Sequence, residues 1–259
     1  MQSVSQLPIV IVPGIQGHWE WMRPTLAALR AHGDVRTFSL NDETGTGDPF
    51  AQWMAHIDQL IDGTGSERVV LIGVSFGGLV VTRFAARRPD RVAALILVSA
   101  PSPRLPLGRT EEKFLRHPLA TLPLFALRGA TRLAPEVIAA KPTWRSRAAF
   151  ALVYGRQVLV KPLAPVKSAR WVRAWQATDI TSDCARVTAP THIITGERDL
   201  DRVVPVPSTL DYLTLIPGAT ASVLPRTGHI GLVSRPDQFA ALVREFLHVV
   251  DDPRSRRSA

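Results

Sequence analysis

The chain has 259 residues, of which 46% are hydrophobic and 20% charged, and its formal net charge at pH 7 is +9. This size and apolar content fit one large folded domain and exclude an intrinsically disordered chain, while the single cysteine, Cys184, excludes an intramolecular disulfide. No stretch approaches the roughly 20 apolar residues of a membrane span and the N-terminus lacks a signal-peptide pattern, so we expect a cytoplasmic protein.

Short apolar runs alternate with helical patterns along the chain. The strongest runs are continuously apolar, which indicates strands buried on both faces, as in a parallel sheet, while the run 35–40 is weaker. The strands are expected at 7–12, 35–40, 68–74, 93–98, 191–195 and 221–224, and helices at 49–62, 76–87 and 236–250. This alternation predicts a doubly wound, mostly parallel α/β sheet.

Residues 101–182 interrupt the alternation. This segment has nine prolines, no convincing strand and helical patches at 148–158 and 167–177. It is too long for a plain loop, and we predict a helical insertion, a cap or lid, over the carboxyl edge of the sheet, where open α/β sheets bind ligands. Residues 1–100 and 183–250 then form the core, and the polar residues 251–259 a disordered tail.

The sequence Gly73-Val74-Ser75-Phe76-Gly77 has the pattern G-x-S-x-G. The pattern alone is common, but here it follows a predicted strand and opens a predicted helix, which is the setting of a nucleophile elbow. The glycines allow strand and helix to approach closely around an exposed serine hydroxyl. We therefore predict that Ser75 is a nucleophile.

A serine nucleophile needs a base and a carboxylate that orients the base. Of the seven histidines, His229 lies in a loop between the last predicted strand and the last helix. Asp199 follows the strand 191–195, with Asp201 as the second choice and Glu197 as a weaker one. The chain order Ser75, Asp199, His229 is the order expected for this kind of fold.

Two backbone N–H groups are expected to hold the oxyanion of the reaction intermediate. One is that of Phe76, after the nucleophile, and the other that of Ile15, in the glycine-bearing loop after the first strand. Gly14, Trp19 and Trp21 belong to or follow this loop and are candidates for the substrate pocket, although core packing explains the tryptophans equally well.

These motifs resemble the α/β-hydrolase superfamily, in its small lidded branch of serine esterases and lipases. The resemblance is carried by the loop 13–17, the elbow 73–78, the segment 196–199 and Gly228-His229. It implies an α/β-hydrolase fold, shortened to a sheet of about six strands without the family's N-terminal hairpin. One departure is Pro13-Gly14, where the family usually has His-Gly. Serine at position 75 argues against epoxide hydrolases and haloalkane dehalogenases, which carry aspartate there.

The positive charge lies in the insertion, which contains 14 arginines and lysines but only four acidic residues. Three interpretations remain open: a solvated basic surface, recognition of an acidic substrate or acidic carrier protein, and contact with an anionic membrane surface. Nucleic-acid binding is disfavoured because no matching motif accompanies the charge.

We predict hydrolysis of carboxylic esters through an acyl-enzyme intermediate, with no metal or cofactor. The same triad is compatible with thioester hydrolysis, perhydrolysis or carbon–carbon bond hydrolysis. An alternative of another class is a hydrolase-like protein that binds a ligand with little turnover.

Overall fold

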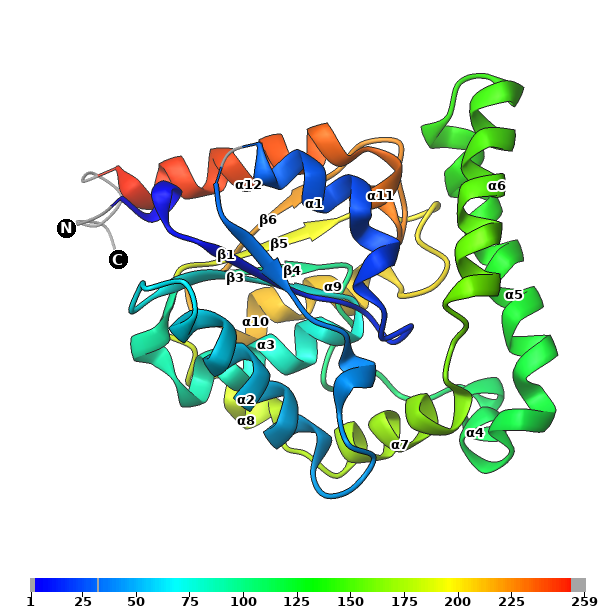
Figure 1. The fold of residues 1–259 in the computed structure, drawn as a ribbon, viewed down its shortest axis with the longest axis horizontal. Coiled ribbons are helices and arrows are strands. Elements are labelled where there is room, and N and C mark those ends of the chain that lie inside the picture. Colours follow the sequence, from blue (N-terminus) through cyan, green and yellow to red (C-terminus); the bar gives the residue numbers. More distant parts are fainter. Residues whose placement is uncertain (1–2, 32, 253–259) are drawn as a thin grey trace.

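Six parallel strands form one sheet in the computed structural model, which describes residues 3–31 and 33–252 (Figure 1). They are β1 (Ile9–Val12), β2 (Val35–Thr37), β3 (Val69–Val74), β4 (Val92–Val98), β5 (Thr191–Thr195) and β6 (Thr220–Val223), in the order β2-β1-β3-β4-β5-β6. The predicted α/β-hydrolase fold is confirmed, with β2 at one edge of a parallel sheet.

The central strands are buried along their whole length, as their continuous apolar sequences predict. The register pairs Gly73 of β3 with Val12 of β1 and Leu97 of β4, so three carboxyl ends lie level. Because β1 lies between β2 and β3, the connections that follow β1 and β3 leave in opposite directions. The crevice between such connections is the usual ligand site of open α/β sheets.

Helices cover both faces of the sheet, and alternate side chains of each strand meet them. One face packs against α1 (Arg23–Arg30) and α12 (Pro236–Asp251), with Leu26 and Phe239 fully buried. The other packs against α2 (Pro49–Asp62) and α3 (Phe76–Arg87), with Trp53 fully buried. Each such side chain contributes roughly 1.5–3 kcal/mol to folding. Short helices complete the core: α9 (Val206–Leu210), α10 (Tyr212–Leu215) and α11 (Gly231–Ser234).

Five helices follow β4 and precede β5, where the insertion was predicted. They are α4 (Arg109–Arg116), α5 (Pro118–Ala140), α6 (Trp144–Val160), α7 (Pro165–Gln176) and α8 (Ile180–Cys184). The pair α5–α6 stands beside the body of the domain (Figure 1), and ten of the thirteen exposed large apolar side chains of the described residues lie between 119 and 166. None of the described helices is both long and apolar enough to cross a membrane.

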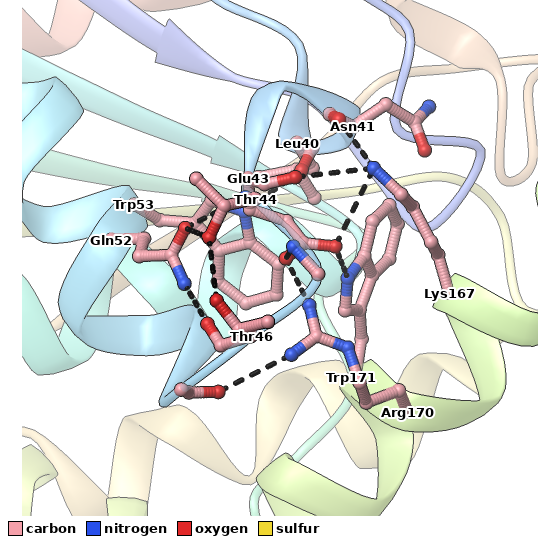
Figure 2. Close-up of polar contacts among 12 residues, drawn as sticks. Leu40, Asn41, Glu43, Thr44, Thr46, Gln52, Trp53, Lys167, Arg170 and Trp171 are labelled. Atoms are coloured by element: carbon pink, nitrogen blue, oxygen red, sulfur yellow. Dashed lines mark hydrogen bonds and ion pairs between the residues drawn. The ribbon is translucent and has the colours of Figure 1, made fainter.

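The helix α7 is, by contrast, part of the core. Its Trp171 is fully buried and meets the Trp53 ring edge-on, with centroids 5.4 Å apart. Figure 2 shows how Glu43, a buried carboxylate after β2, joins the same helix. It pairs with Arg170, accepts a hydrogen bond from the indole N–H of Trp171 at 3.3 Å, and lies 3.7 Å from Lys167. Burial raises the pKa of Glu43, but the hydrogen bonds from Arg170, the N–H of Gly45 and Trp171 outweigh it and hold the pKa below its ordinary value.

The C-terminal end of α12 corrects the predicted start of the tail. Asp251 is the last residue of α12, and its carboxylate accepts hydrogen bonds from the N–H groups of Val4 and Ser5, at 2.6 and 2.9 Å, and from the Ser3 hydroxyl. Burial opposes ionisation, but these bonds prevail and lower the pKa of Asp251 to about 2. The helix therefore extends to 251, because its final side chain is held by the N-terminal segment. The rest of the predicted tail, 253–259, lies outside the described residues.

Candidate active site

Ser75 occupies a sharp turn between β3 and α3. Its φ of 51° lies in a region that residues other than glycine rarely adopt, at a cost of about 1–3 kcal/mol. Its N–H donates to the carbonyl of Val98 at 2.8 Å, which fixes the turn against β4. A Cβ atom on Gly77 would overlap the carbonyl oxygens of Val12 and Pro13. The turn can therefore form only where glycine follows the serine at this spacing.

The imidazole of His229 lies against Ser75. Its Nε2 is 3.1 Å from the Ser75 Oγ, and the ring is buried. His229 belongs to the loop between β6 and α11, as the sequence indicated, and 154 positions separate the two residues. This is hydrogen-bond distance for transfer of the hydroxyl proton to the ring.

The carboxylate at the other ring nitrogen is that of Asp201. Its Oδ2 lies 3.3 Å from His229 Nδ1, and its Oδ1 accepts from the N–H groups of Val203 and Val204 at 3.1 and 3.0 Å. The expectation that Asp199 meets His229 is therefore wrong. After β5 the chain turns, with the N–H of Asp201 bonded to the carbonyl of Glu197 at 3.0 Å. This turn leaves Asp199 exposed and returns the chain to the edge of the sheet at Asp201.

Two glycines bring the loops of Asp201 and His229 into backbone contact. A Cβ on Gly196 would lie 2.5 Å from the carbonyl oxygen of Thr227, and a Cβ on Gly228 would overlap the carbonyl of Leu200. The N–H of Glu197 donates to the carbonyl of Thr227 at 2.8 Å. Glu197, the weakest of the three predicted acids, accepts instead from the N–H of Arg226. This packing holds the distance between the carboxylate and the ring.

A third carboxylate of the site, missed in the sequence, comes from the insertion. Glu136 of α5 is fully buried and accepts a hydrogen bond from the N–H of Ile230 at 3.0 Å. A signal was present, since Glu136 is the only acidic residue between Glu112 and Asp179. Nothing in the sequence, however, places α5 beside the loop of His229.

The two acids near His229 stabilise the protonated form of its ring. Burial lowers the pKa of His229, but the charge of Asp201, its hydrogen bond and the charge of Glu136 together raise the pKa above its ordinary value. For Asp201, burial raises the pKa, while His229 and the two valine N–H groups outweigh it and the pKa is lowered. Asp201 is therefore held as an anion that stabilises an imidazolium.

The loop after β1 comes close to the serine. A Cβ on Gly14 would lie 3.2 Å from that of Ser75, and Gly14 turns the chain by accepting from the N–H of Gly17 at 2.9 Å. Ile15 follows and is half-buried, and Phe76 is the first residue of α3. The first N–H groups of a helix lack partners within the helix. The two predicted oxyanion donors thus lie on the two segments that flank Ser75.

The candidate pocket tryptophans have partners outside the site. The Trp19 ring packs with the cluster of α1 and α12, and the Arg23 guanidinium lies 5.7 Å from its centroid. The ring centroids of Trp21 and Tyr154 of α6 are 6.1 Å apart, and the Trp21 backbone carbonyl accepts a hydrogen bond from the Tyr154 hydroxyl at 3.4 Å. These contacts favour the core-packing interpretation, and a pocket role for either ring stays a prediction.

A comparison with protein-family models decides the classification. The model described as the alpha/beta hydrolase family matches residues 9–242, from β1 into α12. The chain belongs to the alpha/beta hydrolase family. The matched residues include all six strands and the loops that carry Ser75, Asp201 and His229.

This alpha/beta hydrolase has curated relatives with several activities. It is 28% identical to a 2-hydroxy-6-oxo-2,4-heptadienoate hydrolase of Pseudomonas putida, with 94% of this chain and 90% of the relative aligned. It is 34% identical to Esterase PIR7B of Oryza sativa subsp. japonica, over 45% of this chain and 48% of the relative. Among solved structures, Est816, an N-acyl homoserine lactone degrading enzyme, superimposes with a TM-score of 0.73 over 95% of each chain at 20% identity. The chain is thus a hydrolase of this family.

Proposed function

We propose that the chain is a serine hydrolase of carboxylic esters, with Ser75 as nucleophile, His229 as general base and Asp201 as the orienting carboxylate. The observation that carries the proposal is the continuous line of contacts from Ser75 Oγ to His229 Nε2, at 3.1 Å, and from His229 Nδ1 to Asp201, at 3.3 Å. The strained turn at Ser75 supports the same role, since such strain is concentrated at functional sites.

The proposed reaction has two steps. The Ser75 oxygen attacks the ester carbonyl while its proton passes to His229 Nε2, and the N–H groups of Ile15 and Phe76 hold the oxyanion. His229 then gives the proton to the leaving alkoxide, and the acyl group remains on Ser75. In the second step, water loses a proton to His229 and attacks the acyl carbonyl, after which the Ser75 oxygen recovers the proton. Asp201 stays ionised throughout.

The insertion is proposed to act as a lid over this site. Its helix α5 reaches the loop of His229 through Glu136, so the insertion adjoins the reacting groups. Its 14 cations against four acids create a positive field, which favours entry of a negatively charged substrate. We therefore propose an ester with a carboxylate in its acyl or alcohol part.

A second candidate reaction has support from one relative. The Pseudomonas putida protein acts on 2-hydroxy-6-oxo-2,4-heptadienoate, which carries a carboxylate and a ketone but no ester. Hydrolysis of such a molecule must break a carbon–carbon bond, and its carboxylate fits the same basic insertion. Carbon–carbon bond hydrolysis is thus the alternative to ester hydrolysis at the same triad.

The test compares wild type and Ser75→Ala on p-nitrophenyl esters of graded acyl length, each neutral or with a terminal carboxylate, and on the 6-oxo-dienoate. We expect turnover that depends on Ser75 and prefers the anionic esters, with a preference that declines as salt screens the charges. Equal rates in both proteins would contradict the role of Ser75. Turnover of the dienoate alone would favour the second candidate, and a ligand bound without turnover would favour a binding protein.

A further inference from the structure

Glu136 is an unusual residue for its surroundings. Its helix α5 carries exposed side chains such as Leu119 and Leu127, yet the Glu136 side chain is fully buried. A buried carboxylate costs free energy unless it is hydrogen-bonded or paired. The insertion contains 14 cations, but the partners described for Glu136 are the N–H group of Ile230, which donates to Oε2 at 3.0 Å, and the charge of His229. Its other oxygen, Oε1, is buried without a hydrogen-bond partner among the described residues. Its charge is therefore directed at the loop of the catalytic base.

Two further contacts hold the C-terminal part of α5 to the same region. The Arg226 guanidinium donates to the carbonyl of Ala139 at 3.0 Å, and Lys141 Nζ donates to the carbonyl of Ser234 at 2.7 Å. Arg226 is exposed and Lys141 is half-buried, whereas Glu136 is fully buried. Three hydrogen bonds thus join the C-terminal part of α5 and the residue after it to the loop 226–234.

The charged groups that face His229 come from three elements. Asp201 approaches Nδ1 from the loop after β5, and Glu136 lies on the α5 side. In the loop of His229 itself, the Arg226 guanidinium donates to the carbonyl of Ala139. The backbone N–H of Arg226 donates to the Glu197 carboxylate. Among the acids described, Asp201 alone contacts the ring, and Glu136 acts on it only through its charge.

We propose that Glu136 is a positioning residue for His229, which holds the backbone at Ile230 to α5 and adds a second negative charge that stabilises the imidazolium. This proposal rests on the proposed function, in which His229 is the base. It also gives the insertion a role in catalysis, because the base is held in place from α5. Burial raises the pKa of Glu136, and the hydrogen bond from Ile230 and the charge of His229 oppose this shift without cancelling it.

Two variants separate the charge from the hydrogen bond. Glu136→Gln keeps an oxygen that can accept from Ile230 but removes the charge, and Glu136→Ala removes both. Glu112→Gln is the matched control, since Glu112 is an exposed acid of the same insertion whose partner is Arg116, 3.4 Å away.

The first readout is the NMR titration of the His229 ring in the free protein, assigned with His229→Asn. We expect Glu136→Gln to lower the pKa of His229 and Glu112→Gln to leave it unchanged, because the charge of Glu136 acts on the ring and that of Glu112 does not. In kcat/KM, the acid limb of the Glu136→Gln profile should move to lower pH, since the neutral ring is the base. If Glu136 had a purely structural role, Glu136→Gln would change neither the pKa of His229 nor the acid limb of the kcat/KM profile.

The second readout is the rate at which a fluorophosphonate labels Ser75, a reaction in which the Ser75 oxygen displaces fluoride from phosphorus with His229 as base. We expect about a 10- to 100-fold slower labelling in Glu136→Ala, in which the loop is released, and a rate near wild type in Glu136→Gln. Equal His229 titrations in wild type, Glu136→Gln and Glu112→Gln, or wild-type labelling in a folded Glu136→Ala, would overturn the proposal. If Glu136→Ala does not fold, the titration of Glu136→Gln decides alone. If none of the esters is hydrolysed but Glu136→Gln still lowers the pKa of His229, the proposed function is contradicted and the positioning role of Glu136 is retained.

Discussion

Substitution of Asp201 by asparagine separates the two acids that compete for the role beside His229. Asparagine keeps the shape and one oxygen for the N–H groups of Val203 and Val204, so the loop should stay folded. Its amide NH₂, however, is a donor that would face Nδ1, and the ring would then carry its proton on Nε2. Such a ring cannot accept the proton of Ser75.

The expected loss is large. The equivalent change in a Ser-His-Asp triad costs about 10⁴-fold in kcat, or roughly 5.4 kcal/mol at about 1.36 kcal/mol for each tenfold change. Asp199→Asn is the matched control, because Asp199 is exposed and two positions away, and it should keep wild-type kcat. Both variants are assayed on the best ester of the panel, with circular dichroism as a check on folding. An equal loss in the two variants, or wild-type kcat in Asp201→Asn, would refute the assignment.

Three further substitutions test the scaffold. Gly77→Ala should destabilise the fold by about 1–3 kcal/mol and abolish activity, because its Cβ overlaps the carbonyl of Val12, and thermal unfolding of the variant measures this. Glu43→Gln should leave Arg170 without its anion and so reduce the free energy of unfolding at pH 7 by about 1–3 kcal/mol, measured as a lower urea midpoint. Because the folded pKa of Glu43 is lowered, its contribution is present above the unfolded value of 4.5, and the difference from wild type should shrink as pH falls through the folded pKa. Asp251→Ala should also lower the urea midpoint at pH 7. The difference in stability from wild type should disappear as the pH falls from the unfolded pKa of 3.8 to the folded pKa of about 2, and a difference that does not depend on pH would contradict this explanation.

The sequence predicts the sheet well because burial on both faces leaves a plain signal. The fully apolar β3 and β4 lie within one residue of their predicted bounds, and α3 spans 76–87 as expected. The helix α5 was missed because Pro123 and Pro135 lie inside it, and proline normally ends or kinks a helix. Its exposed position beside the domain leaves no burial pattern to compensate.

The sequence predicts those residues of the candidate site that a local sequence pattern marks. Ser75 is marked by the glycines around it, and His229 by its place between a strand and a helix. The choice between Asp199 and Asp201 depends on a single turn, which directs one side chain outward and returns the other to the edge of the sheet. Glu136 depends on the packing of a distant helix, and no motif records such a contact.

The division of the insertion between α7 and the pair α5–α6 defines where this protein can be recombined with its relatives. A chimaera joined at residues 101 and 182 would exchange Trp171 and break its contacts with Trp53 and Glu43, and so would damage the recipient core. A cassette limited to α5 and α6, residues 118–160, leaves those contacts untouched. A chimaera that exchanges only this cassette should fold, and it should be active when the donor sequence has a carboxylate at the position of Glu136.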